Sequence, residues 1–214
     1  MMNRKQQSAT QVLPYQHDVV TKRINCFDPV TMKFASGFLW NKTMMVHMNC
    51  RGYAVSQFMQ PEPSKYSGAP NMEAKTFMQP EQGYFAHHPG RFFYVKCHDS
   101  GQILSIPYEP MRKPLDKFTF SIGMADIVWR IEQLSIEFIL TFSLPVEGCH
   151  ELWQLEIKNL TNEVKNISIY PCFSIGYKSW MNQSASYYPE SNAIIASSIT
   201  PYQKLEDYDK YQQL

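Results

Sequence analysis

Alternation of apolar and polar residues in the stretch 151–170, interrupted by one turn, is the feature that most limits the folds open to this chain. Trp153, Leu155 and Ile157 would fall on one side of an extended backbone, with polar residues on the other side. A turn-rich stretch, 159–163, is followed by a second alternating stretch, 166–170. A helix would scatter the same apolar residues around its axis. The pattern therefore predicts two antiparallel strands around a loop, the central ribbon of a large β-sandwich.

The same period of two recurs along the chain at a spacing of roughly ten residues, and no segment has a convincing helical pattern. Expected strands and strand pairs lie in the ranges 38–48, 91–106, 117–134, 135–143 and 193–199. Residues 60–91 contain many prolines and are expected to form a long loop, and residues 180–192 a polar, aromatic loop. These features predict an all-β fold, a sandwich or a barrel.

A chain of 214 residues is long enough for one large domain with a substantial core. Residues 1–25 have few apolar positions and no periodicity, so we expect a flexible lead-in followed by one β-sandwich domain over 26–214. The final residues, KLEDYDKYQQL, resemble neither a closing strand nor a capped helix. We therefore expect the domain to be incomplete at its C-terminal end.

Charge and cysteine usage restrict the partners and the compartment. Twenty basic and nineteen acidic residues give a formal charge of +1, which offers no reason to expect nucleic acid or an anionic membrane as a partner. The sequence has no apolar run long enough to span a bilayer, and its first residues lack the apolar run of a signal peptide. Five widely spaced cysteines without a CxxC pair predict free, mostly buried thiols in the cytoplasm.

Residue types that carry catalysis are present without a recognisable arrangement. His87 and His88 are adjacent, so they would point to opposite faces of a strand, and we expect no metal site there. No GxSxG motif or glycine-rich phosphate loop occurs. A carboxylate pair for sugar chemistry would have to come from the available acidic residues, most of which are expected on the polar sides of strands or in turns: Asp116, Asp126, Glu132, Glu137, Glu147, Glu151 and Glu156. We predict no catalytic residue in this chain.

Aromatic residues concentrate in one expected loop near the end of the chain. They are Tyr177, Trp180, Tyr187 and Tyr188. Exposed rings can stack on sugar faces, and they equally serve interface packing or burial at the edge of a core. These four residues are the predicted carbohydrate or interface site.

Three ordered motifs give the chain a resemblance to a known family. The first is the aromatic strand 91–95 with an acidic turn and Gly101, and the second is the exit from Ser105 to Pro110. The third is the pattern ExWxLxIxN from Glu151, followed by a short turn and the stretch 167–170. In this order, over roughly residues 50–214, the chain resembles the N-terminal domain of inverting glycoside phosphorylases. That family comprises cellobiose, cellodextrin and chitobiose phosphorylases, formerly glycosyltransferase family 36.

The resemblance implies a large antiparallel β-supersandwich similar to galactose mutarotase. In the family this domain precedes an (α/α)6 barrel, which carries the general acid and most of the sugar and phosphate contacts. The domain here would be non-catalytic alone, would support a homodimer, and would cover an active site with the loop 177–192. The parent enzyme would cleave β-linked oligosaccharides with inversion, using inorganic phosphate as co-substrate and no other cofactor.

Two departures and two alternatives remain. The Met- and Pro-rich stretch 59–90 is longer than expected for cellobiose phosphorylase, and Cys97-His98 replaces an acidic pair. One alternative is a free-standing carbohydrate-binding sandwich, motivated by the loop aromatics. The other is an aldose-epimerase-like enzyme, which needs a histidine acid and a carboxylate base in one cleft; His98 and His150 are its only candidates.

Overall fold

The computed structural model describes residues 13–58, 90–173 and 182–199, and within these ranges every regular element is a β-strand. The strands are β1 (Tyr15–Asp18), β2 (Arg23–Cys26), β3 (Ser36–Trp40), β4 (Met44–Asn49), β5 (Ala54–Phe58), β6 (Arg91–Cys97), β7 (Ile103–Ile106), β8 (Lys117–Ile122), β9 (Asp126–Gln133), β10 (Ile136–Ser143), β11 (Leu152–Asn159), β12 (Ile167–Phe173), β13 (Asn182–Tyr188) and β14 (Ala193–Ile199). All paired strands are antiparallel. The predicted all-β fold is confirmed.

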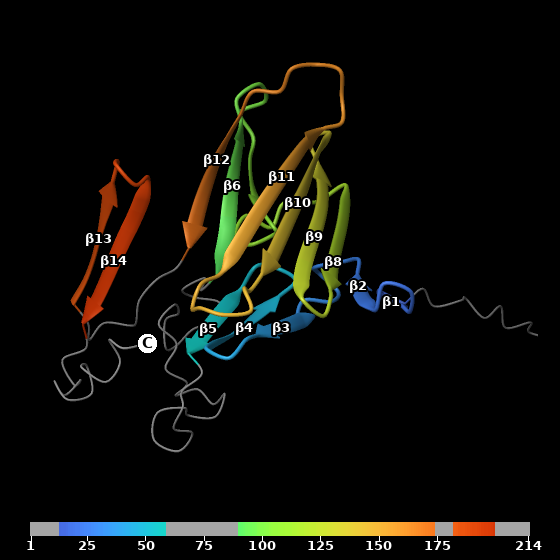
Figure 1. The fold of residues 1–214 in the computed structure, drawn as a ribbon. Coiled ribbons are helices and arrows are strands. Elements are labelled where there is room, and N and C mark those ends of the chain that lie inside the picture. The colour runs from blue at the N-terminus through green and yellow to red at the C-terminus, as the bar shows by residue number, and fades with distance from the viewer. Residues whose placement is uncertain (1–12, 59–89, 174–181, 200–214) are drawn as a thin grey trace, which may run out of the picture.

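Four sheets organise these strands (Figure 1). The largest has six strands in the order β1-β2-β8-β9-β10-β11, and the order β12-β6-β7 makes a second sheet that packs against it. A third sheet, β3-β4-β5, crosses the lower end of both in Figure 1. The hairpin β13-β14 forms the fourth. One hydrophobic cluster includes buried residues from the first three sheets.

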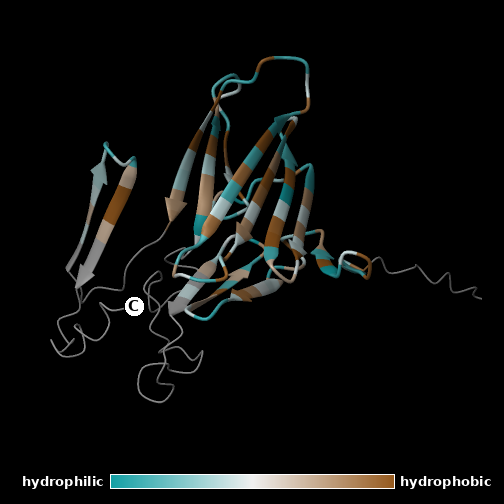
Figure 2. Cartoon of the chain, in the orientation of Figure 1, coloured by the Kyte–Doolittle hydropathy of each residue, from teal (hydrophilic) through white to brown (hydrophobic). Residues whose placement is uncertain are grey.

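Alternation within the strands explains the sandwich. In β10, Ile136, Phe138, Leu140 and Phe142 are buried, while the residues between them are partly exposed. Phe138, Leu140 and Phe142 each lie opposite apolar residues of both β9 and β11, so one face of the sheet is apolar along most of its length. Bands of opposite hydropathy follow one another along these strands in Figure 2. The predicted strand pairs 91–106 and 117–134 and the strand 135–143 are confirmed.

Trp129 is the centre of the core. Its side chain is fully buried, and its indole Nε1 donates a hydrogen bond of 2.8 Å to the backbone oxygen of Cys50. Its ring packs on Phe120, with centroids 5.2 Å apart, and stacks on Trp153 at 5.9 Å. Trp129 therefore joins the six-stranded sheet to the end of β4.

The predicted ribbon of residues 151–170 is corrected by the structure. Both stretches are strands, but β11 pairs with β10 while β12 pairs with β6. They lie in different sheets, each at an edge, and residues 160–166 cross between the sheets. The alternating apolar sides of β11 and β12 both face the same core, from opposite layers of the sandwich.

Two further expectations differ from the structure. The range 1–25, expected to be a lead-in without secondary structure, contains β1 and most of β2, and Arg23 anchors this hairpin through an ion pair of 2.6 Å with Asp126. Residues 182–188 were expected to be part of a loop but form β13. They pair with the predicted strand 193–199, and this pairing supplies their backbone hydrogen bonds. Their weak alternation gave no sign of a strand.

Substitution of Trp129 tests the position of the core. Trp129→Ala should lower the free energy of unfolding by ~3–5 kcal/mol, because it removes a large buried ring and leaves a cavity. Trp40→Ala is the matched control, because Trp40 is 69% exposed on β3, and should change stability by no more than ~0.5 kcal/mol. Urea unfolding followed by circular dichroism measures both. Equal losses would contradict this assignment of the core.

Candidate functional site

The most elaborate polar cluster of the described chain is a buried ion pair between Arg91 and Glu151. Arg91 begins β6, and Glu151 immediately precedes β11. The side chains are 0% and 8% exposed. Arg91 Nε donates to Glu151 Oε2 at 2.9 Å and Arg91 Nη2 to Glu151 Oε1 at 2.7 Å. The contact is thus a two-pronged guanidinium–carboxylate pair.

Ser56 and Trp153 complete this cluster. Arg91 Nη2 donates to the Ser56 hydroxyl at 2.8 Å, and that hydroxyl donates to Glu151 Oε1. Trp153 Nε1 donates to Glu151 Oε2 at 2.7 Å. Each oxygen of the Glu151 carboxylate therefore accepts two hydrogen bonds. The cluster joins β5, β6 and β11, which belong to three different sheets.

Close backbone packing positions Arg91. The Arg91 amide donates to the Gly52 oxygen at 3.1 Å, and Tyr53 and Gly90 form an antiparallel bridge. A Cβ on Gly90 would collide with the Gly52 oxygen and the Phe92 ring, so only glycine fits there. Phe173 of β12 lies beneath the guanidinium, with its ring centroid 6.0 Å from Arg91 Cζ.

This arrangement holds Glu151 as a carboxylate. Burial alone would raise the pKa of Glu151, but the hydrogen bonds and charge of Arg91, together with Ser56 and Trp153, outweigh burial and lower the pKa below its ordinary value. A general acid needs the opposite shift, toward neutral pH. The chemistry of the Arg91–Glu151 cluster is structural: it neutralises a buried charge and fixes three strands.

A second buried carboxylate, Glu109, also pairs with arginine side chains. Glu109 is fully buried and contacts Arg51 at 2.5 Å and Arg112 at 2.8 Å. The Arg51 guanidinium also lies over the Tyr108 ring, 5.2 Å from its centroid. Glu109 thereby ties the segment after β7 to the turn between β4 and β5.

Three of the other carboxylates named from the sequence pair with basic side chains at or near the surface. Asp126 pairs with Arg23, Glu132 with Lys117 at 2.7 Å, and Glu137 lies 4.0 Å from Arg130. These groups occupy the solvent side of the strands or its margin, where ion pairs contribute little. Glu132 and Glu137 lie directly opposite each other across β9 and β10, and each is near a basic side chain, Lys117 or Arg130. This arrangement is typical of a surface charge network rather than of an acid–base pair in a sugar cleft.

The predicted aromatic site is only partly within the described residues. Tyr177 and Trp180 lie outside them. Tyr187 and Tyr188 are exposed on β13, and as consecutive residues of a strand they point to opposite faces. The Tyr187 hydroxyl donates to Asn192 Oδ1 at 2.9 Å. The two tyrosines therefore do not form one flat platform.

The two histidines that were alternative candidates for the acid of an epimerase-like enzyme lie in different parts of the sandwich. His98 follows β6, at the end of the sandwich where the 160–166 crossing lies, and its Nε2 is 2.8 Å from the Ser168 hydroxyl. His150 precedes β11 and so lies at the end of β11 that is opposite to the 160–166 crossing. His87 and His88 lie outside the described residues. The described ranges hold no group of three or more His, Cys, Asp or Glu side chains that could bind a metal ion.

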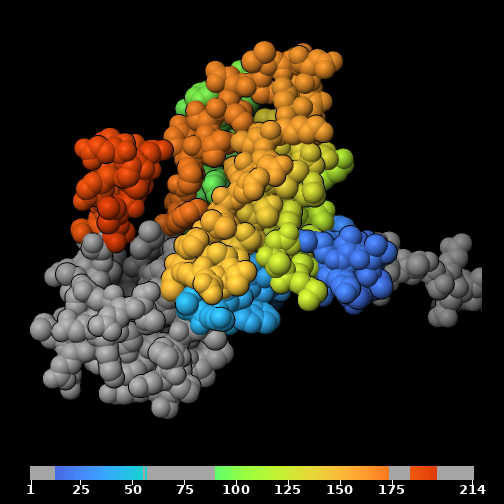
Figure 3. Space-filling view, in the orientation of Figure 1, coloured from blue at the N-terminus to red at the C-terminus, as the bar shows by residue number. Residues whose placement is uncertain are grey.

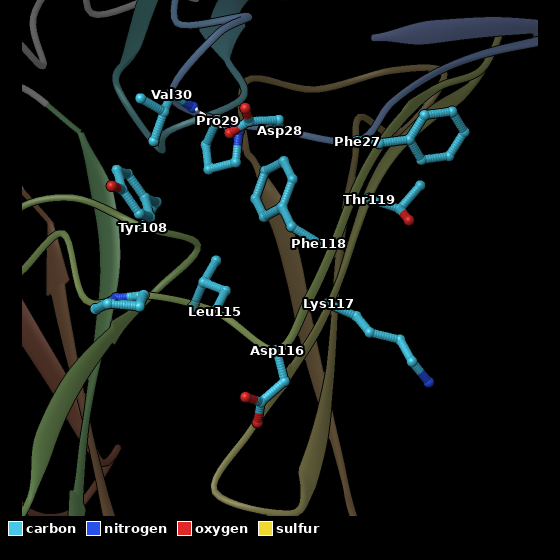
Figure 4. A pocket seen from close by; sticks show the side chains of 11 residues that line it. Phe27, Asp28, Pro29, Val30, Tyr108, Leu115, Asp116, Lys117, Phe118 and Thr119 are labelled. Atoms are coloured by element: carbon cyan, nitrogen blue, oxygen red, sulfur yellow. Dashed lines mark hydrogen bonds between the residues drawn. The ribbon is translucent and has the colours of Figure 1, made fainter. Parts of the chain in front are cut away.

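A surface pocket of about 520 Å³ lies between the segment after β2 and the start of β8 (Figure 4). It is lined by Phe27, Asp28, Pro29, Val30, Tyr108, Pro114, Leu115, Asp116, Lys117, Phe118 and Thr119. Asp28 is engaged by the Val30 amide at 2.7 Å and the Thr31 hydroxyl at 2.8 Å. Asp116 and Lys117 point away from the Phe118 ring. The pocket has no converging acid and base.

Sequence reasoning missed an exposed aromatic face on the third sheet. Phe38 and Trp40 alternate with buried Leu39, so both rings project to solvent. His47 of β4 stacks on Phe38 with centroids 4.4 Å apart, and its burial lowers the pKa of His47. Alternation predicted strands in the range 38–48, but it could not tell which face of them is buried.

No helix in the described part of the chain is long and apolar enough to cross a membrane.

The pH dependence of stability tests the Arg91–Glu151 cluster. Glu151→Gln should cost ~3–5 kcal/mol at pH 7, because it leaves the Arg91 guanidinium buried beside a neutral group. Because the folded-state pKa is lowered, the contribution is fully present above the unfolded pKa of about 4.3 and is lost as the pH falls through the folded value.

The difference between wild type and Glu151→Gln should therefore shrink on acidification. Glu156→Gln, on the exposed side of β11, is the matched control and should have little effect at either pH. A difference that stays constant from pH 7 to pH 3 would contradict the lowered pKa of Glu151.

Comparison with known proteins identifies the family to which this architecture belongs. A family model described as "Glycosyl hydrolase 94, supersandwich domain" matches residues 64–205, well over half of the chain. A cellobionic acid phosphorylase of Neurospora crassa is 51% identical over 193 residues, 90% of this chain and 24% of that protein. An N,N'-diacetylchitobiose phosphorylase of Vibrio proteolyticus is 25% identical over 126 residues, 58% of this chain and 15% of that protein.

The chain thus spans about a quarter or less of the length of these curated relatives. The predicted resemblance to the N-terminal domain of the glycoside phosphorylases is confirmed. This all-β chain belongs to the Glycosyl hydrolase 94 family, of which it carries the supersandwich domain.

Proposed function

We propose that this chain serves as the non-catalytic sandwich domain of a β-glycoside phosphorylase. The observation that carries the proposal is the 51% identity to a cellobionic acid phosphorylase over nearly the whole chain. The ion pairs of Glu109 and Glu151 support it, because these buried carboxylates are committed to holding strands together. The substrate class is a β-linked disaccharide of the cellobionic acid kind.

In this proposal the chemistry takes place in the remainder of the enzyme. Inorganic phosphate attacks the anomeric carbon while a carboxylic acid protonates the leaving glycosidic oxygen, which yields a sugar 1-phosphate with inverted configuration. The sandwich contributes a homodimer interface and, through residues 177–192, a cover for an active site. The free thiols of Cys26, Cys50 and Cys97 support a reducing, cytoplasmic location.

A chimaera tests this function. The matched 193-residue segment of the Neurospora enzyme is replaced by the matched segment of this chain. The chimaera should form sugar 1-phosphate from cellobionic acid and phosphate to within about tenfold of the parent rate, because a well-fitting scaffold keeps the reacting groups aligned. The isolated chain and the Neurospora enzyme without the segment should be inactive.

Two results would refute the proposal. One is sugar 1-phosphate formed by the isolated chain. The other is a chimaera that is folded by circular dichroism yet inactive. Light scattering on the chimaera gives the separate test of the homodimer, for which the expected mass is that of two chains.

Carbohydrate binding by the sandwich itself is a second candidate, favoured by the exposed aromatic face on β3 and β4. Phe38 and Trp40 are two residues apart on one strand, so their rings lie about 7 Å apart along a rigid surface. Asn41 fixes the adjoining turn, because its amide donates to the Pro145 and Gly148 oxygens at 2.9 Å. Such a face can stack on neutral sugar rings.

Isothermal titration of the chain with cello-oligosaccharides measures this binding. Trp40→Ala should weaken binding by roughly tenfold or more, because it removes an exposed ring on which a sugar face can stack. Tyr187→Ala, on the exposed hairpin, should leave the affinity unchanged. If wild-type protein gives no heat with any of these sugars, the second candidate fails.

A further inference from the structure

One edge of the β12-β6-β7 sheet has no strand on it in the described chain. β12 pairs with β6 on one side only, so the amide and carbonyl groups along its other side form an open edge. The core-facing residues of β12 include Ile167, Ile169 and Phe173. They are more exposed than their partners Cys97, Val95 and Arg91 in β6, which are all buried.

The facing sheet is uncovered on the same side. β11 is its last strand, and Ile157 is 41% exposed although its partner Phe138 in β10 is fully buried. Trp153 and Leu155 are partly buried against the same core. Both layers of the sandwich therefore end with apolar side chains that another strand would cover.

The β13-β14 hairpin also carries apolar side chains that are exposed to solvent. Tyr188 and Ile195 occupy one face, and Tyr187 and Ile194 the other; Ile194 is 70% and Ile195 53% exposed. In Figure 3 the hairpin, in red, stands clear of the orange surface of β12 in this view. A two-stranded hairpin is marginal in water unless a third strand or an apolar surface supports it.

We infer that the β13-β14 hairpin docks on the free edge of β12, giving a five-stranded sheet in the order β14-β13-β12-β6-β7. Two observations select this occupant. β6, β12, β13 and β14 all have seven residues, so their lengths match across the sheet. Only residues 174–181 separate β12 from β13, which places the hairpin within reach of the neighbouring position, about 4.8 Å away. This inference does not depend on the proposed function.

Equal strand lengths also fix the register. With β12 and β13 antiparallel and in full overlap, Phe173 lies opposite Asn182, Tyr170 opposite Ala185, and Ile167 opposite Tyr188. The face that carries Tyr188 and Ile195 then turns toward the core, beside Ile167 and Ile169. The other face, with Tyr187 and Ile194, turns outward with Tyr170.

A cysteine pair tests docking and register together in the full chain. Tyr170→Cys and Ala185→Cys, combined with Cys172→Ser, place two thiols directly opposite on the outer face. Mild oxidation should form a disulfide within one chain, identified by mass spectrometry of non-reduced peptides. The control pair Tyr170→Cys and Ala196→Cys lies one strand further apart, because Ala196 is the β14 partner of Ala185. That pair should not crosslink.

A second pair of variants separates docking from chance collision. Ile195→Asp places a carboxylate on the inward face and should lower the yield of the disulfide by roughly tenfold or more, because a charge cannot be buried there unpaired. Ile194→Asp, on the outward face, should leave the yield unchanged. Circular dichroism establishes that both variants retain the sandwich.

Four results would overturn the inference. They are equal yields from the test pair and the control pair, no disulfide from either pair, equal effects of the two aspartate variants, and a disulfide found mainly between two chains. The last result would assign the β12 edge to the hairpin or the β12 strand of a second copy.

Discussion

The arrangement of this domain depends on the ion pair that Arg91 forms with Glu151. A buried carboxylate and a buried guanidinium are each costly to remove from water, and their attraction offsets that cost only in good geometry with the remaining hydrogen bonds made. Ser56 and Trp153 provide hydrogen bonds of that kind to the Glu151 carboxylate. The four residues lie on or beside strands of three different sheets. Their hydrogen bonds and ion pair can therefore form in only a few relative positions of those sheets. The cluster thus acts on the geometry of the fold more than on its overall stability.

Much of the strand content could be predicted from the alternation of side chains, but strand pairing could not. β11 and β12 are adjacent in sequence and both alternate, so a local hairpin was the natural prediction. The structure pairs them with β10 and β6, because a sandwich needs its two apolar layers face to face rather than edge to edge. A period of two specifies a face; it does not specify a neighbour. The strands β1, β2 and β13 were missed because their polar composition gave the pattern little contrast.

The Arg91–Glu151 cluster could not be predicted from the sequence either, because its residues are distant in the chain and no local pattern joins them. Arg91 and Glu151 are 60 residues apart, and each alone resembles an ordinary charged residue at a strand end. Only one local signal bore on them: Glu151 and Trp153 share a face, as an i, i+2 pair in a strand must. Glu151 was counted among the carboxylates expected on the polar sides of strands or in turns. In the structure it is buried and accepts four hydrogen bonds. Similarly, strands were predicted in the range 38–48, but nothing in the pattern showed that Phe38 and Trp40 face solvent.

Buried contacts join the sheets at one end of the domain, whereas core residues are exposed along one side, and this difference has a functional consequence. Where the two sheets meet the β3-β4-β5 layer, charged groups are neutralised in pairs and the tryptophan rings are stacked, so this end has little freedom to change. At β11 and β12 the same core reaches the surface, and its apolar side chains lack cover. A domain built in this way is rigid where its sheets are joined and adaptable along one side. β12, on that side, ends at Phe173 and is followed along the chain by residues 177–192, the part proposed to cover an active site. Order in the cover and closure of the sandwich are therefore expected to depend on one another.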